Sequence, residues 1–177
     1  SIEGAIRCIQ KSLKIIGYSL IDLKSLNNFS PQKTDLKTTL ETAIKMGEAY
    51  INEKNIEICK ELENNITVEL DENKFLACIV NIIKNAIEAI EITGKISVRS
   101  SIDDNGKAQV IISNTGKPIS IDKQKEIFEE GFTTKPTGSG LGLHICKTNL
   151  ELQNAKLQLD KSDEYSTEFK ISIPICN

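Results

Sequence analysis

Apolar residues near the start of the chain recur at alternating steps of four and three positions. The set consists of Ile2, Ile6, Ile9, Leu13, Ile16, Leu20 and Leu23. This spacing is that of an a/d heptad seam and predicts an amphipathic helix that packs against other helices. An amphipathic helix lying on its own domain is the alternative. Polar residues and Pro31, in the stretch 27–33, end the pattern and predict a linker.

Two other periodicities organise the rest of the chain. Helical spacing of apolar residues predicts helices over 35–51, 72–92 and 141–152, and a short helical segment around 121–129. Asp71 is the expected N-cap of the second of these helices, and Gly94 is its expected stop. Alternation with period two predicts strands over 55–62, 66–70, 95–102, 107–113, 155–161 and 166–174.

The predicted strands come mostly in hairpins, with helices between them, and DDNG at 103–106 is a strong turn signal. We therefore expect an α+β fold, a two-layer sandwich in which helices cover one face of a single mixed, mostly antiparallel sheet. A coiled-coil-like helix would precede it.

Composition narrows the range of partners. Lys and Arg total 22 against 25 for Asp and Glu in 177 residues, a net charge of −3 that predicts no nucleic-acid partner. The longest apolar run, 75–80, is too short to span a membrane, and no leader opens the chain, so we expect no membrane contact by these residues. Five cysteines without a C-x-x-C pair favour a reducing cytosol.

A polar stripe marks the helix expected around NIIKNAIEAI, residues 81–90. Asn81, Lys84, Asn85 and Glu88 share one face, opposite an Ile-rich face. Asn is a mediocre helix former, so two of them on one stripe suggest a role, whereas an ordinary solvated face is the alternative. An amide oxygen is a suitable ligand for Mg²⁺.

Two glycine-containing segments follow. In ISNTGKPIS, residues 112–120, Asn114 offers a donor and an acceptor together, as the edge of adenine does, and Gly116 lets the backbone approach a base; a plain turn is the alternative. In GSGLGL, residues 138–143, glycines before a predicted helix free backbone amides to face a phosphate. This segment is neither a Rossmann fingerprint nor a Walker loop.

In order and spacing these segments resemble the catalytic ATP-binding domain of sensor histidine kinases, in the GHKL superfamily. NIIKNAIEAI resembles the N box, ISNTGKPIS the first glycine box, IFEEGFTTKPTG the F box and lid, and GSGLGLHI the second glycine box. The resemblance implies the Bergerat ATP-binding fold for residues 31–177. It also implies that residues 1–30 are the second helix of a dimerisation and histidine-phosphotransfer domain, so that the chain, which begins at Ser1 rather than Met, is a piece of a longer protein.

The resemblance implies ATP and Mg²⁺ as ligands. Asn85 would bind Mg²⁺, with Asn81 near the phosphates, while Asn114 would read adenine with support from Thr167. The remaining nucleotide contacts would come from Gly116, Thr134, Lys135, Gly138, Ser139, Gly140, Leu141 and Gly142, with Phe128 and Phe132 as lid anchors. Lys84 is a candidate phosphate contact, and an ordinary exposed helix lysine is the favoured alternative.

The sequence departs from the family pattern in three ways. Asn114 stands where the family has Asp and Pro118 where it has a second Gly, so we expect weakened or altered nucleotide binding. The heptad helix holds no histidine, and the single histidine of the chain, His144, follows the second glycine box as an expected packing or surface residue. The phospho-acceptor histidine therefore lies outside this chain.

The resemblance thus implies a kinase domain that donates the γ-phosphoryl group of Mg–ATP to a histidine outside the chain, for relay to a response regulator receiver domain. The parent protein would be a homodimer through its own dimerisation domain, with this domain in the cytoplasm even if the parent is membrane-anchored. One alternative is an ATPase like the topoisomerase, chaperone or mismatch-repair branches, disfavoured because Asn81 stands where those have a catalytic Glu. The other is a degenerate GHKL binding module or phosphotransfer adaptor with weak or no nucleotide binding.

Overall fold

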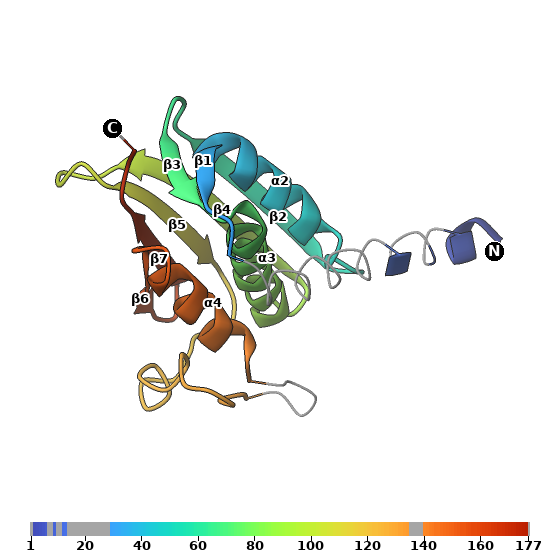
Figure 1. The fold of residues 1–177 in the computed structure, drawn as a ribbon. Coiled ribbons are helices and arrows are strands. Elements are labelled where there is room, and N and C mark those ends of the chain that lie inside the picture. Colours follow the sequence, from blue (N-terminus) through green and yellow to red (C-terminus); the bar gives the residue numbers. More distant parts are fainter. Residues whose placement is uncertain (1, 7–8, 10–11, 14–28, 135–139, 177) are drawn as a thin grey trace.

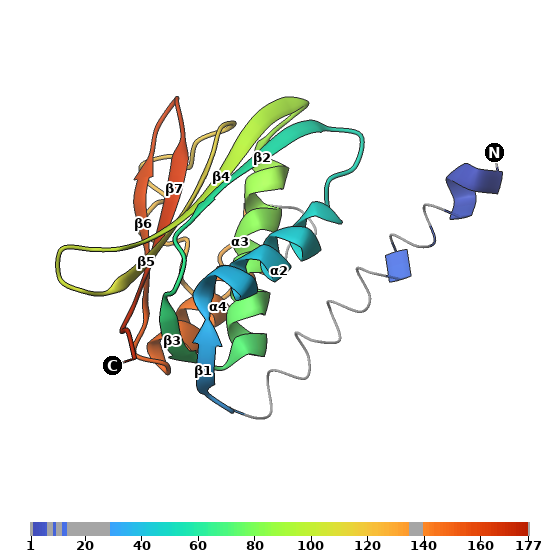
Figure 2. The ribbon, with the colours of Figure 1, turned by 90° about the horizontal axis from the view of Figure 1, so that it is seen from above.

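The computed structural model of this chain describes residues 2–6, 9, 12–13, 29–134 and 140–176. The described residues before 14 are helical, and the side chains of Ile2, Ile6, Ile9 and Leu13 are between 48% and 81% exposed. Figure 2 shows the N-terminus standing apart from the sheet and its helices. The rest of the predicted heptad helix lies outside the described residues.

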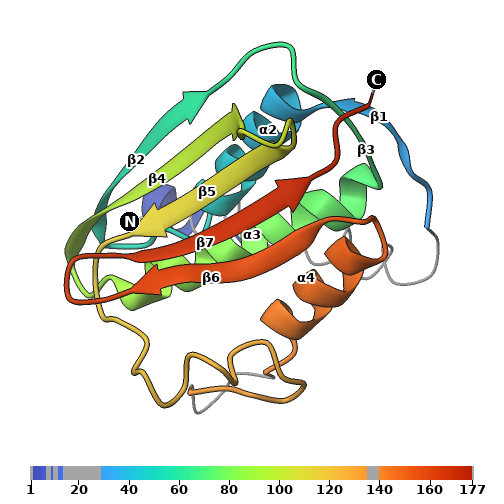
Figure 3. The same cartoon turned by 90° about the vertical axis from the view of Figure 1, so that its left-hand side faces the viewer.

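A five-stranded sheet forms one layer of the molecule and helices form the other (Figures 1 and 3). The strand order is β2-β4-β5-β7-β6, in which β2 runs parallel to β4 and the other neighbours are antiparallel. The elements are β1 (Gln32–Asp35), α2 (Leu36–Glu48), β2 (Asn55–Leu62), β3 (Thr67–Leu70), α3 (Glu72–Ala89), β4 (Thr93–Ile102), β5 (Ala108–Asn114), α4 (Gly142–Glu151), β6 (Lys156–Ser162) and β7 (Thr167–Ile173). The predicted α+β sandwich with a mixed, mostly antiparallel sheet is confirmed.

The core lies between the sheet and α3. Every second residue of β5 and of β7 is buried, as expected for strands with one face against helices. From the helix side, Phe75, Ile79 and Ile83 are fully buried at intervals of four residues. Each such side chain contributes about 1.5–3 kcal/mol by leaving water, so this apolar stripe sets how α3 sits on the sheet.

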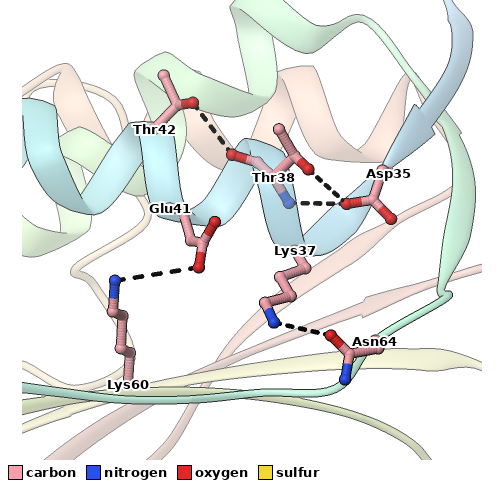
Figure 4. A network of polar contacts seen from close by, with 7 residues as sticks. All are labelled: Asp35, Lys37, Thr38, Glu41, Thr42, Lys60 and Asn64. Carbon is pink, nitrogen blue, oxygen red and sulfur yellow. Dashed lines mark hydrogen bonds and ion pairs between the residues drawn. The ribbon is translucent and has the colours of Figure 1, made fainter.

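Polar contacts join α2 to the sheet (Figure 4). Asp35 caps the helix, because its Oδ1 accepts from the backbone N–H of Thr38 at 2.8 Å and from Thr38 Oγ1 at 2.7 Å. These hydrogen bonds, the backbone one first, lower the pKa of Asp35. Further along, Lys37 Nζ donates to Asn64 Oδ1 at 2.7 Å, and Glu41 pairs with Lys60 at 4.0 Å.

The helix α3 begins as predicted and ends earlier than predicted. Asp71 is its N-cap and accepts from Lys74 N, whereas the helix stops at Ala89 and the predicted stop at Gly94 is wrong. Gly94 lies in β4, paired with Ile56. The carbonyls at this end are satisfied from elsewhere, because the ammonium of Lys54 donates to Ile87 O at 2.8 Å and to Ile90 O at 2.6 Å.

The expectation of a single sheet is also wrong. Strand β3 pairs antiparallel with β1 in a separate two-stranded sheet, and β1 includes Gln32 and Lys33, which the sequence placed in the linker. Near the C-terminus, Ile175 forms a bridge with Val68 and so joins the chain end to this sheet. The short helical segment expected around 121–129 is instead a series of turns closed by hydrogen bonds between residues three apart.

Candidate nucleotide-binding site

The helices α3 and α4 lie side by side and run antiparallel. Their contacts fall in reverse order along the two helices: Asp71 with Gln153, Cys78 with Cys146, and Asn81 with Gly142 and Cys146. The N-terminus of α4, where the second glycine box ends, therefore lies beside the middle of α3. Because Asn85 follows Asn81 by one helical turn, it lies on the same face of α3, just beyond this N-terminus.

The amide of Asn81 lies directly against Gly142. A Cβ at Gly142 would lie 2.6 Å from Asn81 Oδ1, and Asn81 Nδ2 donates to Cys146 Sγ at 3.7 Å. A side chain at position 142 would have to displace the Asn81 amide, so glycine favours this close contact, in addition to the backbone freedom inferred from sequence. This packing brings the predicted N box and second glycine box together.

The first glycine box is held against the C-terminal end of α3. Lys117 N donates to Ala89 O at 2.9 Å. Gly116 has φ +115°, and a Cβ there would collide with the carbonyl oxygen of Ala89. An open hollow of about 640 Å³ borders this junction, lined by Ala89, Glu91, Ile92, Thr93, Gly116 and Lys117. The loop can therefore take this position only with glycine at 116.

The two residues expected to read adenine lie opposite each other. Asn114 at the end of β5 pairs with Thr167 at the start of β7, and each is 5% exposed. Asn114 Nδ2 donates to Thr115 O at 2.8 Å, and Thr167 Oγ1 lies 2.7 Å from Ser162 Oγ. The sheet register thus places these two polar side chains next to each other, although 53 positions separate them in the sequence, from 114 to 167.

Sequence reasoning missed Ser162, which links this pair to the loop after the first glycine box. Its Oγ accepts from Ile119 N at 2.8 Å, besides its contact with Thr167. Gln124 adds to the link, because its Nε2 donates to Ile119 O at 2.9 Å and to Ser162 O at 3.2 Å. The only signal in the sequence was the position of Ser162 at a hairpin turn, which is where serine is common in any case.

The two ends of the lid segment meet. Gly131 N donates to Gly140 O at 3.1 Å, and Gly140 has φ +70° with its α-carbon so close to Gly131 that a Cβ would collide with that residue's carbonyl. The residues between them include Thr134, which is exposed, and Lys135, Gly138 and Ser139, which lie outside the described residues. The lid therefore leaves and rejoins the domain at one place, next to the start of α4.

Phe128 packs the first part of the lid segment onto the domain. Its ring meets that of Phe169 edge-on, with centroids 6.3 Å apart, and Lys147 Nζ lies 5.8 Å from its centroid. His144 is half-buried, with Nδ1 3.1 Å from the carbonyl oxygen of Phe128. Phe132 also packs partly buried against the core. These contacts agree with the expected lid anchors and with a packing role for His144.

Lys84 is exposed on α3, as expected of an ordinary helix lysine. Its ammonium lies 5.3 Å from the ring centroid of Tyr50, in the segment after α2. Asn85, by contrast, is half-buried on the face that also carries Asn81. An amide oxygen at this place fits Mg²⁺, which usually takes one or two protein oxygens and completes its shell with phosphate and water.

Comparison with known proteins agrees with this geometry. The family of histidine kinase-, DNA gyrase B-, and HSP90-like ATPases matches residues 70–177, from the last residue of β3 to the end of the chain. The chain belongs to this family. Its matched region contains the N box, both glycine boxes and the lid, so ATP binding is the activity that membership implies.

Relatives within the ATPase family are sensor kinases. The signal transduction histidine-protein kinase AtoS of Escherichia coli K12 is 25% identical over 145 residues, which are 81% of this chain and 24% of AtoS. The adaptive-response sensory kinase SasA of Rippkaea orientalis is 32% identical over 129 residues, 70% of this chain and 33% of SasA. The chain thus spans about a quarter to a third of these curated relatives.

Solved structures give the same assignment. The catalytic domain of the histidine kinase ThkA superposes with a TM-score of 0.73 at 31% identity, covering 82% of this chain and 95% of that one. ThkA in complex with the response regulator protein TrrA gives 0.71 at 26% identity, covering 99% of this chain and 52% of that one. By family and by fold, this chain carries a histidine kinase catalytic domain. Among its described residues, no helix is both long and apolar enough to cross a membrane.

Proposed function

We propose that this chain is the phosphoryl-donor part of a two-component sensor kinase. It binds Mg–ATP and presents the γ-phosphoryl group to a histidine outside these residues, from which the group passes to a response regulator. The observation that carries the proposal is the antiparallel packing of α3 on α4. It brings Asn81 into contact with Gly142, so that the N box and the second glycine box line one site.

Adenine would bind where Asn114 and Thr167 meet. The amide oxygen of Asn114 is the acceptor that the exocyclic amine of adenine needs, and one amide hydrogen is already used by Thr115 O. A neutral amide replaces the charged acceptor of the family pattern. Since hydrogen bonds to charged groups are roughly twice as strong as neutral ones, we expect binding that is weaker and still specific.

The phosphates would lie at the start of α4. Backbone N–H groups at this N-terminus and the helix dipole favour an anion there, and Gly140, Leu141 and Gly142 shape the approach. Gly116, at the other end of α3, would let the backbone approach the base. Thr134, and beyond the described residues Lys135, Gly138 and Ser139, would approach from the lid. Asn85 would hold Mg²⁺, which when bound neutralises phosphate charge in the transfer step. The chain itself contributes mostly positioning.

Two observations support the proposed partners. The exposed apolar side chains at positions 2, 6, 9 and 13 suit a helix that pairs with others in a homodimer's dimerisation domain. A similar protein, ThkA, is described in complex with the response regulator TrrA, and we propose a receiver domain as partner here.

The proposed location is the cytoplasm. Free thiols suit a cytoplasmic domain, and the described chain has them at Cys59, Cys78, Cys146 and Cys176.

Calorimetry with Mg²⁺–ADP tests the proposed binding function. We expect Asn85→Ala to abolish the Mg²⁺-dependent part of the binding heat, because the metal loses its amide ligand. His144→Ala is the control and should bind as the unaltered chain does, since His144 packs against the carbonyl oxygen of Phe128 and is not among the proposed nucleotide or metal ligands. Equal losses in the two variants would contradict these roles.

The same titration distinguishes the proposed function from a degenerate binding module. A degenerate module would give no heat with folded unaltered chain at millimolar nucleotide. A hydrolytic ATPase is disfavoured because Asn81, whose amide packs on Gly142 and Cys146, has no basic group to activate water. Steady phosphate release that an added dimerisation domain leaves unchanged would favour hydrolysis after all.

A further inference from the structure

A buried carboxylate joins three separate segments at the N-terminal end of α3. Asp71 is 4% exposed, and its Oδ1 accepts from Lys74 N at 3.1 Å as the helix cap. Its Oδ2 accepts from the backbone N–H of Ser30 at 2.8 Å, 41 residues earlier in the chain. Its own N–H donates to Gln153 Oε1 at 2.6 Å. Asp71 thus contacts α3, the end of α4 and the segment that leads into β1, residues 29–31, here called the entry segment.

The link to α4 is also buried. Gln153 is 7% exposed, directly follows α4 and its C-cap, and its Nε2 donates to Asn149 O at 3.0 Å, in the last turns of the helix. The amide of Gln153 therefore connects the backbone of Asp71 to the backbone of α4. Buried polar groups that are all hydrogen-bonded in this way make a specific and rigid junction.

This junction and the nucleotide site lie at different points along the same helix pair. Asp71 meets Gln153 where α3 begins and α4 ends, whereas Asn81 meets Gly142 where α4 begins. Because α3 and α4 are antiparallel and packed together, a segment attached at the first contact has a fixed orientation relative to the second.

Burial holds the entry segment only weakly. Phe29 is 49% exposed, and Ser30 and Pro31 are exposed as well. An open groove of about 370 Å³ lies beside them, lined in part by Phe29, Pro31, Leu152 and Pro174. The pairing of β1 with β3 fixes the chain from Gln32 onward, and the hydrogen bond from Ser30 N to the buried Asp71 carboxylate extends this anchoring two residues further toward the N-terminus.

We propose that Asp71 is a positioning residue for phosphoryl transfer. By holding the Ser30 N–H against the joined ends of α3 and α4, it sets the direction in which the chain before residue 30 meets the domain, and so its angle to the bound nucleotide. The inference rests on the proposed function, in which the acceptor histidine belongs to the domain that the chain before residue 30 continues. Transfer needs the two reacting groups in line, so a changed entry angle slows the reaction without loosening the nucleotide.

Ser30→Pro is the direct test, with Ser30→Ala as its matched control. Proline removes the N–H that Asp71 accepts and leaves the α3 cap untouched. The residue before Pro31 is already biased toward extended conformations, which include the one that proline adopts. Alanine removes only the exposed hydroxyl and keeps the N–H.

The kinetics are measured in the full-length protein, as kcat and KM for ATP in autophosphorylation. We expect Ser30→Pro to lower kcat by about tenfold, given how strongly rates depend on alignment, with KM within about twofold, and Ser30→Ala to change neither. Unchanged kcat in Ser30→Pro would overturn the inference, and so would equal losses in both variants. A loss that falls entirely on KM would show that the contact acts on nucleotide binding instead, and would overturn it too.

Asp71→Asn provides a second route. Asn is as good an N-cap as Asp, and when its oxygen accepts from Lys74 N as the cap, its NH2 group stands where Oδ2 accepted from Ser30 N, so that contact is lost. We expect the same kcat loss with folded protein, and wild-type kcat would contradict the role of Asp71. Calorimetry with Mg²⁺–ADP on the unaltered chain distinguishes failure of the proposed function from failure of the positioning role. Absent binding would contradict the proposed function itself. Normal binding together with normal kcat in both variants would contradict only the positioning role.

Discussion

The two ends of α3 are capped in different ways. At its N-terminus the helix is capped by Asp71, the residue directly before it, with a hydrogen bond to a backbone N–H three positions on. At its C-terminus the carbonyls are satisfied by distant groups, namely the Lys54 ammonium and the backbone N–H of Lys117. The second end is the one beside the first glycine box. Where the chain must bind a ligand, long-range contacts replace local capping, so this end of the helix depends on the loops around it.

The largest expected effect comes from placing a side chain at that junction. Gly116→Ala combines φ +115° with a collision against Ala89 O, so we expect a loss of about 3 kcal/mol in the free energy of unfolding. Urea denaturation measures it. We also expect weaker Mg²⁺–ADP binding, because the loop must leave α3.

Gly106→Ala is the matched control for this change. Gly106 has φ +73° and open space around it, so only backbone strain remains, costing about 1 kcal/mol. Similar losses in the two variants would mean that the carbonyl of Ala89 does not constrain the loop.

An intermediate effect is expected for the side-chain cap. Lys54→Met keeps the length of the aliphatic stem and removes the donor to Ile87 O and Ile90 O, which should cost about 1–2 kcal/mol of unfolding free energy. Since the same helix end supports Gly116, ADP affinity should fall as well. Lys107→Met, at an exposed lysine in the β4–β5 turn, controls for loss of charge. Full stability in Lys54→Met would show that water replaces the ammonium without cost.

The smallest effect concerns pH and the Asp35 N-cap of α2. Hydrogen bonds from Thr38 lower the pKa of Asp35 below 3.8 in the folded protein, so the carboxylate stabilises the fold above its unfolded pKa. That contribution is lost as pH falls through the lowered folded pKa. Because Asp35 is exposed, it amounts to roughly a few tenths of a kcal/mol.

Urea titrations between pH 5 and pH 2 on the unaltered chain and Asp35→Asn measure this contribution. Asn caps a helix as well as Asp does and does not titrate, so the variant should lose less stability on acidification. Parallel curves for the two proteins would show that the Asp35 cap carries no pH-linked stability.

Local signals in the sequence were sufficient for most elements. Alternation placed β2 at 55–62, as the structure has it, and Asp71 was identified as a cap because Asp before an apolar helix is a strong start signal. The stripe of Asn81 and Asn85 was visible because Asn is disfavoured inside helices. These features depend on residues a few positions apart, so a linear pattern can contain them.

Features that depend on distant partners were mispredicted or missed. Gly94 was read as a helix stop, but it lies in β4, and carbonyls at the end of α3 accept from Lys54, a residue 33 positions before Ile87. The strand β1 is four residues long and becomes a strand only by pairing with β3. Similarly, the role of Ser162 depends on Ile119 and Thr167. Such contacts leave no periodicity in the sequence.

The sequence by itself determined the class of fold, the order of the nucleotide boxes and the absence of an acceptor histidine from the heptad helix, because periodicity and residue identity are properties of the chain alone. The tertiary structure decided how those boxes meet. The sheet register placed Asn114 opposite Thr167, and the antiparallel packing of two helices placed Asn81 on Gly142 and Asp71 on Gln153. A site assembled from four segments exists only where the packing of the core brings them together, and this is a property of the folded domain.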